Sequence, residues 1–273
     1  MNFSVHKGGN AINSEILDDI ARRYESISDA VCREFWGINV EERHSMYVGS
    51  YGRGTAISTS DIDILLELPK NEYYHYSSLT GNGQSRLLQT VKKSVLSRYP
   101  RTEVHGDGQV VVVVFSDGMR FELLPAFETS SGEYEYPDTH MGGNWKSTNP
   151  KAEQEALKRK DVESNGLLVD TCRQIRFLRD TYFTNEHLPG ILIDAFVYDS
   201  IANWHWGSGN GTSHQSEYSS GHPYEESLLK KFRIATAWGG VPQWRAPGSG
   251  MRIDNSASIC NSLGKILKKM AEE

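Results

Sequence analysis

The sequence has few cysteines and no long apolar run. Three cysteines, Cys32, Cys172 and Cys260, lie far apart among 273 residues, and no pair has CxxC spacing. An odd number without paired spacing argues against a disulfide framework, so we expect reduced cysteines that pack in the interior. No stretch approaches the roughly 18 apolar residues of a membrane span, and no secretory leader pattern begins the chain. We therefore expect a cytoplasmic protein with no membrane partner.

The sequence also lacks an excess of basic charge. Its formal net charge is −6 and its pI is about 5.9. That balance argues against a protein that grips long nucleic acid through its phosphates, although a local basic cluster could still hold a small anionic substrate. The hydrophobic share of 38% and the charged share of 23% are those of an ordinary folded protein, and the length suits two lobes that share a cleft.

The first half of the chain predicts a small sheet with helices. Apolar residues three and four positions apart predict a long helix over 13–36, with Asn13 or Ser14 as its cap. The stretches MYVGS and DIDILLEL predict strands, and QVVVVVFSDGMRFELLPAF predicts a hairpin that turns at Asp-Gly. Prolines and glycines predict a loop over 69–83, followed by a helix that begins at Ser85.

The second half predicts mainly helices, after a polar stretch over residues 128–144. A segment almost without apolar side chains, residues 207–221, predicts either a connector or a lid over a site. We place the boundary between two lobes after residue 144, with 1–144 as one lobe and 145–273 as the other. The predicted helices are 150–163, 165–183, 189–206, 225–237 and 256–271.

Two aspartates separated by one isoleucine carry the clearest chemical signal. Side chains alternate along a strand, so Asp61 and Asp63 project from one face while the apolar residues between them face the core. Adjacent carboxylates repel unless a cation lies between them, and oxygen ligands favour Mg²⁺ or Mn²⁺. If the strand of Glu122 is the neighbour, a third carboxylate joins them and two ions can be held, as in-line phosphoryl transfer requires. An isolated DxD is also compatible with a solvated strand edge.

A glycine and a serine precede this pair by a short interval. Gly49 and Ser50 end a predicted strand, where exposed backbone N–H groups and a hydroxyl can cradle phosphate oxygens, and Arg53 adds charge nearby. The 11 positions from Ser50 to Asp61 let the chain return as an adjacent strand. A phosphate cradle beside a metal site predicts a triphosphate pocket.

The segment GSYGRGTAISTSDIDI resembles the GS-x-GT-SDxD signature of the DNA polymerase β-like nucleotidyltransferase superfamily. Four later segments are similar in order and spacing to the CD-NTase group, which includes bacterial synthases of cyclic oligonucleotide signals, cyclic GMP-AMP synthase and oligoadenylate synthetase. The resemblance covers roughly residues 13–205. It implies an α+β fold with a polymerase β-like catalytic lobe, a mostly helical second lobe and an active site in the cleft between them. The later segments are VVVVFSDGMRFELLPAF, GGNWKSTNPKAEQEAL, TCRQIRFLRDTY and LPGILIDAF.

The resemblance also implies roles for the residues that match the signature. Gly49 and Ser50 would contact the donor triphosphate, and Asp61 and Asp63 would bind two Mg²⁺ or Mn²⁺ ions. Glu122 would bind the catalytic metal and help deprotonate the attacking ribose hydroxyl.

Further nucleotide contacts are implied around these residues. Arg176 falls where the group often has a lysine that reaches the triphosphate, although it could equally be an exposed helix charge. Tyr51 could stack on a base or pack beside the loop. Asn149 and Lys151 would lie with Trp145 where the lobes meet, near the nucleotides, although a buried tryptophan there is an equally good structural interpretation.

The implied function is nucleotidyl transfer between nucleoside triphosphates, which would give a cyclic or short linear oligonucleotide messenger and release pyrophosphate. A downstream effector protein would read the product, in anti-phage defence. Activation by long nucleic acid is not expected, because the chain shows neither a zinc module nor a basic face. Two alternatives stay open: transfer to a protein, a transfer RNA or a small molecule, and a nucleotide sensor without catalysis.

Overall fold

The computed structural model describes residues 3–37, 43–207, 213–215, 224–237 and 239–272, and divides into two compact units. The sheet unit comprises residues 13–52 and 60–150, and the helical unit comprises 1–12, 53–59 and 151–273. This division corrects the predicted boundary after residue 144, because the strand that begins there pairs within the sheet unit. It also assigns residues 53–59 to the helical unit, although they were predicted within the first lobe.

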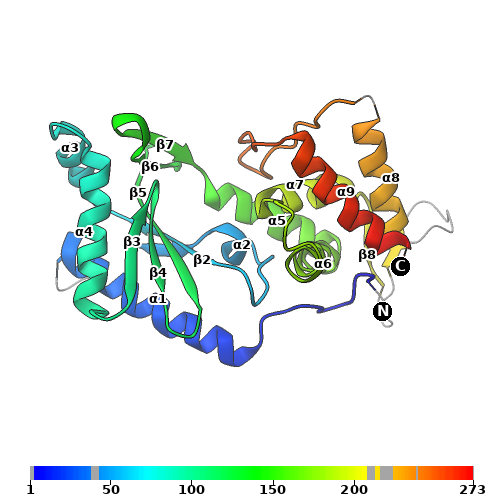
Figure 1. Ribbon diagram of the computed structural model, residues 1–273, viewed down its shortest axis with the longest axis horizontal. Coiled ribbons are helices and arrows are strands. Elements are labelled where there is room, and N and C mark those ends of the chain that lie inside the picture. The colour runs from blue at the N-terminus through cyan, green and yellow to red at the C-terminus, as the bar shows by residue number, and fades with distance from the viewer. Residues whose placement is uncertain (1–2, 38–42, 208–212, 216–223, 238, 273) are drawn as a thin grey trace. The chain divides into compact units, whose positions relative to one another are not determined.

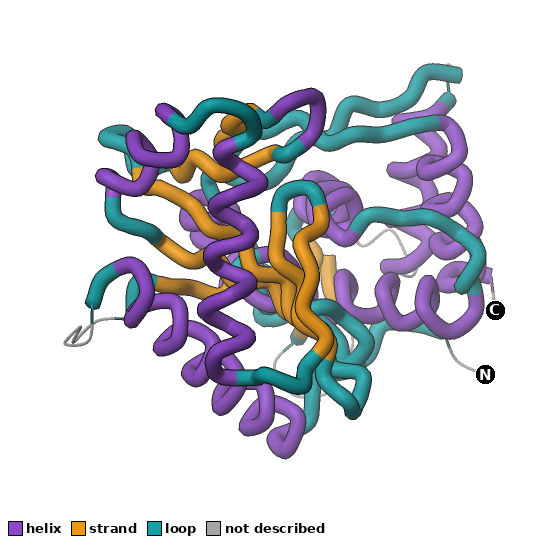
Figure 2. The backbone as a smooth tube through the Cα atoms, turned by 60° about the vertical axis from the view of Figure 1, so that its left-hand side comes forward, coloured by secondary structure: helices purple, strands orange, loops and turns teal. Residues whose placement is uncertain are grey.

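The sheet unit is built on a mixed sheet (Figures 1 and 2). Strands β2 and β5 run parallel at its centre, and the other pairs are antiparallel. Along the main path the order is β1 (Ser45–Tyr47), β2 (Ile62–Glu67), β5 (Arg120–Glu128), β4 (Val110–Val114) and β3 (Glu103–Asp107), while β6 (Tyr134–Asp138) pairs with the end of β5 and with β7 (Asn144–Thr148).

Two long helices bury one face of this sheet. Helices α1 (Ser14–Phe35) and α4 (Gly83–Arg98) share one apolar cluster with the inward residues of β2, β4 and β5. The predicted cap is confirmed, because Asn13 accepts a hydrogen bond from the backbone N–H of Ile16 at 2.8 Å. The strand residues of the cluster are Ile62, Ile64, Leu66, Val104, Val111, Val113, Phe121, Leu123 and Phe127.

Some elements of the sheet unit differ from the predictions. Helix α3 (Lys70–Ser78) occupies most of the predicted 69–83 loop, so that prediction was wrong. Pro69 stands at the N-cap, where a helix tolerates proline, and the helix buries Tyr76 in the core. Strands β3, β6 and β7 were not predicted from sequence, because their polar residues hide the period-two pattern while their backbones still pair.

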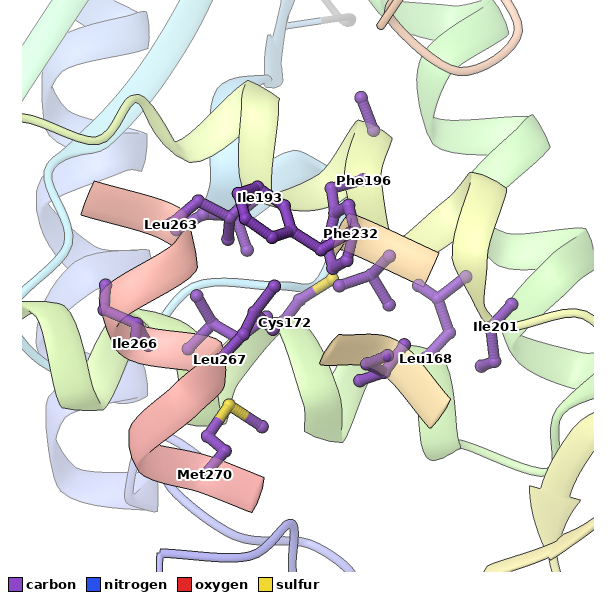
Figure 3. Close-up of a cluster of buried hydrophobic side chains, with 14 of the residues drawn as sticks. Leu168, Cys172, Ile193, Phe196, Ile201, Phe232, Leu263, Ile266, Leu267 and Met270 are labelled. Carbon is purple, nitrogen blue, oxygen red and sulfur yellow. The ribbon is translucent and has the colours of Figure 1, made fainter. Parts of the chain in front are cut away.

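The helical unit packs around its own core (Figures 1 and 3). The close-up shows apolar side chains of α9 (Ala257–Glu272), among them Leu263 and Leu267, on the side that faces Cys172 and Ile193. The confirmed helices are α5 (Pro150–Glu163), α6 (Leu167–Tyr182), α8 (Tyr224–Thr236) and α9. All three cysteines are buried and free, as predicted.

One predicted helix of this unit ends early. Helix α7 (Gly190–Ser200) stops before residue 206, and the predicted remainder forms β8 (Trp204–Trp206), which pairs with β9 (Ser213–Gln215). Of the predicted 207–221 loop, 208–212 and 216–221 lie outside the described residues. Among the described helices, none has both the length and the apolar character needed to cross a bilayer.

Candidate active site

Parallel pairing of β2 and β5 brings two of the predicted carboxylates side by side. Asp63 is the cross-strand partner of Glu122. On either side of this pair, Ile64 and Phe121 are fully buried toward the helices, so the two carboxylates project from the opposite face. The prediction that the two strands are neighbours is therefore confirmed.

An arginine lies between the third carboxylate and Glu122. The Arg120 guanidinium donates to Glu122 Oε1 at 2.7 Å from Nη2, and its Nε lies 3.6 Å from Asp61 Oδ2. The hydrogen bond to Glu122 raises the pKa of Arg120. Asp61, directly before β2, and Glu122 therefore share one cation. Arg120 was not among the residues predicted from the sequence, although its place two residues before Glu122 puts it on the same face of the strand.

Gly49 brings the backbone against Asp63. Its φ is +57°, and a Cβ built at this position would lie 1.8 Å from Asp63 Oδ2. The Val48 N–H donates to the Asp63 carbonyl at 2.9 Å, which fixes the approach. Gly49 also begins the short helix α2 (Gly49–Gly52), which contains Ser50. Only glycine fits here, and the predicted cradle therefore adjoins a predicted metal ligand.

The donor set fits a hard divalent cation. Asp61, Asp63 and Glu122 offer only carboxylate oxygens, which are the ligands that Mg²⁺ and Mn²⁺ prefer. As the side chains are placed, no three acidic, histidine or cysteine side chains of the described ranges surround one point where an ion could sit. The Arg120 side chain is one-third exposed and can rotate toward solvent, which would let the carboxylates converge.

Tyr51 packs in a row of aromatic rings. Its ring lies 4.5 Å from that of Tyr47, which stacks on Tyr24 at 4.2 Å. Burial raises the pKa of the Tyr51 hydroxyl. Of the two interpretations of Tyr51, the structure shows the packed one, and stacking on a base stays a prediction.

Two arginines that were predicted to contact nucleotide form buried ion pairs instead. Arg176 is 1% exposed and donates to both oxygens of Asp194, at 2.7 and 2.9 Å. Arg53 donates from Nε to Asp194 at 2.9 Å and from Nη1 to Glu153 at 3.0 Å. Guanidiniums buried in this way are not presented to a triphosphate, so the structure does not support these two contacts. The sequence did contain one signal for such a pair. Asp194 lies in the otherwise apolar run GILIDAF, and a buried carboxylate requires a cationic partner.

The residues of the NWKSTNPK stretch separate between the units. Trp145 lies inside the sheet unit, where its indole N–H donates to Ser77 Oγ at 3.0 Å and its ring lies 4.9 Å from that of Tyr73. The position of Trp145 where the lobes meet stays a prediction. Asn149 is half-buried after β7, and Lys151 is exposed in the first turn of α5. Their contact with nucleotide stays a prediction, as does a cleft between the lobes.

A family model and a curated protein that match this chain are both described as nucleotide synthases or synthetases. Residues 10–161 match the family model SMODS, described as a Second Messenger Oligonucleotide or Dinucleotide Synthetase domain. A curated protein of Bacillus cereus (strain VD146), named "Probable cyclic nucleotide synthase", is 22% identical over 165 residues, which are 57% of this chain and 49% of that protein. This chain therefore spans about half the length of that curated relative.

Solved structures share the fold across nearly the whole chain. The CdnE cyclic dinucleotide synthase of Elizabethkingia meningoseptica with GTP and Apcpp has a TM-score of 0.62 at 14% identity, over 91% of this chain and 89% of its own. The Bradyrhizobium diazoefficiens CD-NTase CdnG with GTP has a TM-score of 0.64 at 16% identity, over 96% and 87%. The STING-associated CdnE c-di-GMP synthase of Capnocytophaga granulosa has a TM-score of 0.66 at 13% identity, over 90% and 77%. The predicted α+β fold is confirmed.

The approach of Gly49 to Asp63 predicts an unusually costly alanine substitution. Gly49→Ala combines a left-handed backbone, which costs a residue with a Cβ about 1–2 kcal/mol, with a clash against Asp63. Gly132→Ala is the matched control, because Gly132 has φ +78° and open space around its Cβ position. We expect Gly49→Ala to lower the free energy of unfolding, measured by urea denaturation, by clearly more than Gly132→Ala. Equal losses would contradict the close approach.

Proposed function

The chain belongs to the SMODS family of second messenger oligonucleotide or dinucleotide synthetase domains, and from that premise we propose that it joins nucleoside triphosphates into a cyclic or short linear oligonucleotide. One observation carries the proposal: Asp63 lies opposite Glu122 on the parallel strands and against the backbone of Gly49. The family match spans all three residues and the neighbouring Asp61.

In the proposed site each residue has a chemical task. The first turn of α2, with the backbone of Gly49 and the hydroxyl of Ser50, would bind phosphate oxygens of the donor triphosphate. Asp61, Asp63 and Glu122 would hold two Mg²⁺ or Mn²⁺ ions. When bound, these ions would neutralise charge on the phosphates and on the attacking oxygen.

The proposed reaction is an in-line substitution at phosphorus. Glu122 would accept the proton of a 2′ or 3′ ribose hydroxyl. That oxygen forms a bond to the α-phosphorus of a second triphosphate, while the bond from this phosphorus to the bridging oxygen breaks and pyrophosphate leaves. A second transfer on the joined acceptor would close a ring. Orientation and charge neutralisation supply most of the acceleration, because the protein forms no covalent intermediate.

The names of the related structures support nucleoside triphosphates as the substrates. Two of them were solved with GTP, and one of these also with Apcpp, while a third is described as STING-associated. We propose that this chain likewise uses triphosphates in the cytoplasm and that a separate effector protein reads its product in anti-phage defence.

Product analysis tests this proposal directly. The protein is incubated with the four ribonucleoside triphosphates and Mg²⁺, treated with phosphatase and examined by mass spectrometry. We expect phosphatase-resistant products whose masses equal two or more joined nucleotides, together with released pyrophosphate. Transfer of labelled nucleotide to a protein or a transfer RNA would instead support the alternative acceptors. Binding of triphosphate without turnover would support a sensor.

Neutral variants of the facing carboxylates test the site. Asp63→Asn and Glu122→Gln keep the shapes of the side chains and remove their charge, so product formation should fall by about two to three orders of magnitude. Glu67→Gln is a matched control, because Glu67 lies four residues after Asp63 on the same strand. The control should keep near-normal activity, and full activity in both Asp63→Asn and Glu122→Gln would refute the assignment.

Metal removal gives an independent prediction. Treatment with a chelator should abolish product formation, and Mg²⁺ or Mn²⁺ should restore it, because carboxylate oxygens bind small hard cations. Isothermal titration calorimetry, with Mg²⁺ added to the protein in the presence of a nonhydrolysable triphosphate, should show ion binding to the unmodified protein. The same titration of Asp61→Asn should show weaker binding. Undiminished activity in excess chelator would exclude the proposed metal dependence.

A further inference from the structure

A segment of seven residues connects α2 to Asp61 and belongs to the helical unit. This connecting segment is Arg53–Thr59, and the residues on both sides of it, Gly52 and Ser60, belong to the sheet unit. The chain therefore passes from one unit to the other and back between the proposed phosphate cradle and the proposed metal ligands. The contacts that hold this segment in place therefore affect both the proposed cradle and the proposed metal ligands.

One buried carboxylate anchors the start of the connecting segment. Asp194 Oδ2 accepts hydrogen bonds from Arg53 Nε at 2.9 Å and from Thr55 Oγ1 at 3.2 Å. The same carboxylate accepts hydrogen bonds from both terminal nitrogens of Arg176. The Asp194 and Thr55 side chains are fully buried, so water does not compete for these bonds.

Other contacts fasten the rest of the connecting segment. Arg173 Nη2 donates to the Gly54 carbonyl at 2.9 Å, and Thr59 Oγ1 donates to Asp180 at 2.6 Å. Between these points Ala56 and Ile57 are each only 4% exposed. The segment is thus ordered by the helical unit along its length.

The charges at Asp194 make it the centre of this arrangement. Burial raises its pKa, but the guanidiniums of Arg176 and Arg53 outweigh that effect and lower the pKa to about 2. Asp194 is therefore ionised at neutral pH and balances two buried cations. Its loss would leave these cations without their shared partner, which is strongly unfavourable in a protein interior.

We propose that Asp194 is a positioning residue for the nucleotidyl transfer proposed above. It fixes Arg53 and Thr55, and the connecting segment transmits that constraint through the main chain to α2 on one side and to Asp61 on the other. Movement of either end by about 1 Å would misplace the triphosphate or a metal ligand, and errors of that size cost about a hundredfold in rate. The inference depends on the proposed function for its catalytic part only.

A pair of matched variants separates positioning from general stability. Asp194→Asn removes the charge that fastens the connecting segment. Asp170→Asn is the control, because Asp170 is also buried in the helical unit, at 6% exposure, but accepts from Trp206 Nε1 and the Gly8 N–H instead. Both variants should lower the melting temperature. Thr55→Val, which removes one hydroxyl and keeps the shape, gives a milder second test if Asp194→Asn does not fold.

Hydrogen–deuterium exchange and steady-state kinetics give the readouts. We expect faster exchange in peptides that cover residues 49–61, and a kcat reduced about ten- to a hundredfold with a smaller change in KM, in Asp194→Asn but not in Asp170→Asn. Thr55→Val should shift both readouts in the same direction by less. Normal exchange at 49–61 in Asp194→Asn and Thr55→Val would overturn the anchoring, and faster exchange with unchanged kcat would overturn the positioning role.

The two proposals fail in different ways. If the unmodified protein makes no oligonucleotide, the proposed function fails, while the exchange comparison still decides whether Asp194 orders the connecting segment. If the unmodified protein is active, and Asp194→Asn and Asp170→Asn show the same kcat and the same exchange at residues 49–61, only the positioning role is wrong.

Discussion

The parallel pairing of β2 with β5 is the constraint on which the candidate site depends. Its register places Asp63 opposite Glu122, and the same register places Ile62 opposite Phe121 and Ile64 opposite Leu123 in the core. A shift of one residue would turn the carboxylates into the apolar interior and the apolar side chains into water. The hydrophobic energy that packs α1 and α4 on the sheet therefore also fixes the relative position of the acidic side chains.

A second constraint acts on the other unit. Asp194, Arg176, Arg53 and Glu153 have balanced formal charges, and their geometry is directional, with several hydrogen bonds to one buried carboxylate. Replacement of such a buried network by well-packed apolar residues is often neutral or stabilising, whereas removal of one partner leaves an uncompensated buried charge. Here the network includes Arg53 of the connecting segment, and such loop segments are otherwise the most mobile parts of a protein.

Sequence reasoning reached the features that follow from local patterns. The amphipathic period of α1, the valine run of β4 and the Asp-Gly turn were sufficient for those elements. Strand alternation predicted a common face for Asp61 and Asp63, which Glu122 would join if its strand were the neighbour. It failed where long-range pairing decides. The polar strand β7 exists because its backbone pairs with β6. Arg176 was predicted from the sequence to contact nucleotide, and the fold showed that Asp194, 18 positions later, accepts its hydrogen bonds. The positive φ of Gly49 was likewise hidden in a common GS dipeptide.

The crossings of the chain between the two units restrict how such a protein can be divided or recombined. A gene fragment that encodes residues 151–273 would carry Asp194 and Arg176 but not Arg53 and Thr55, because these lie in an insertion from the earlier half of the sequence. A single cut in the gene therefore cannot separate the whole helical unit from the sheet unit. Exchange of this unit between relatives, in the laboratory or in evolution, must transfer residues 1–12 and the seven-residue insertion together with residues 151–273, or replace their contacts as well.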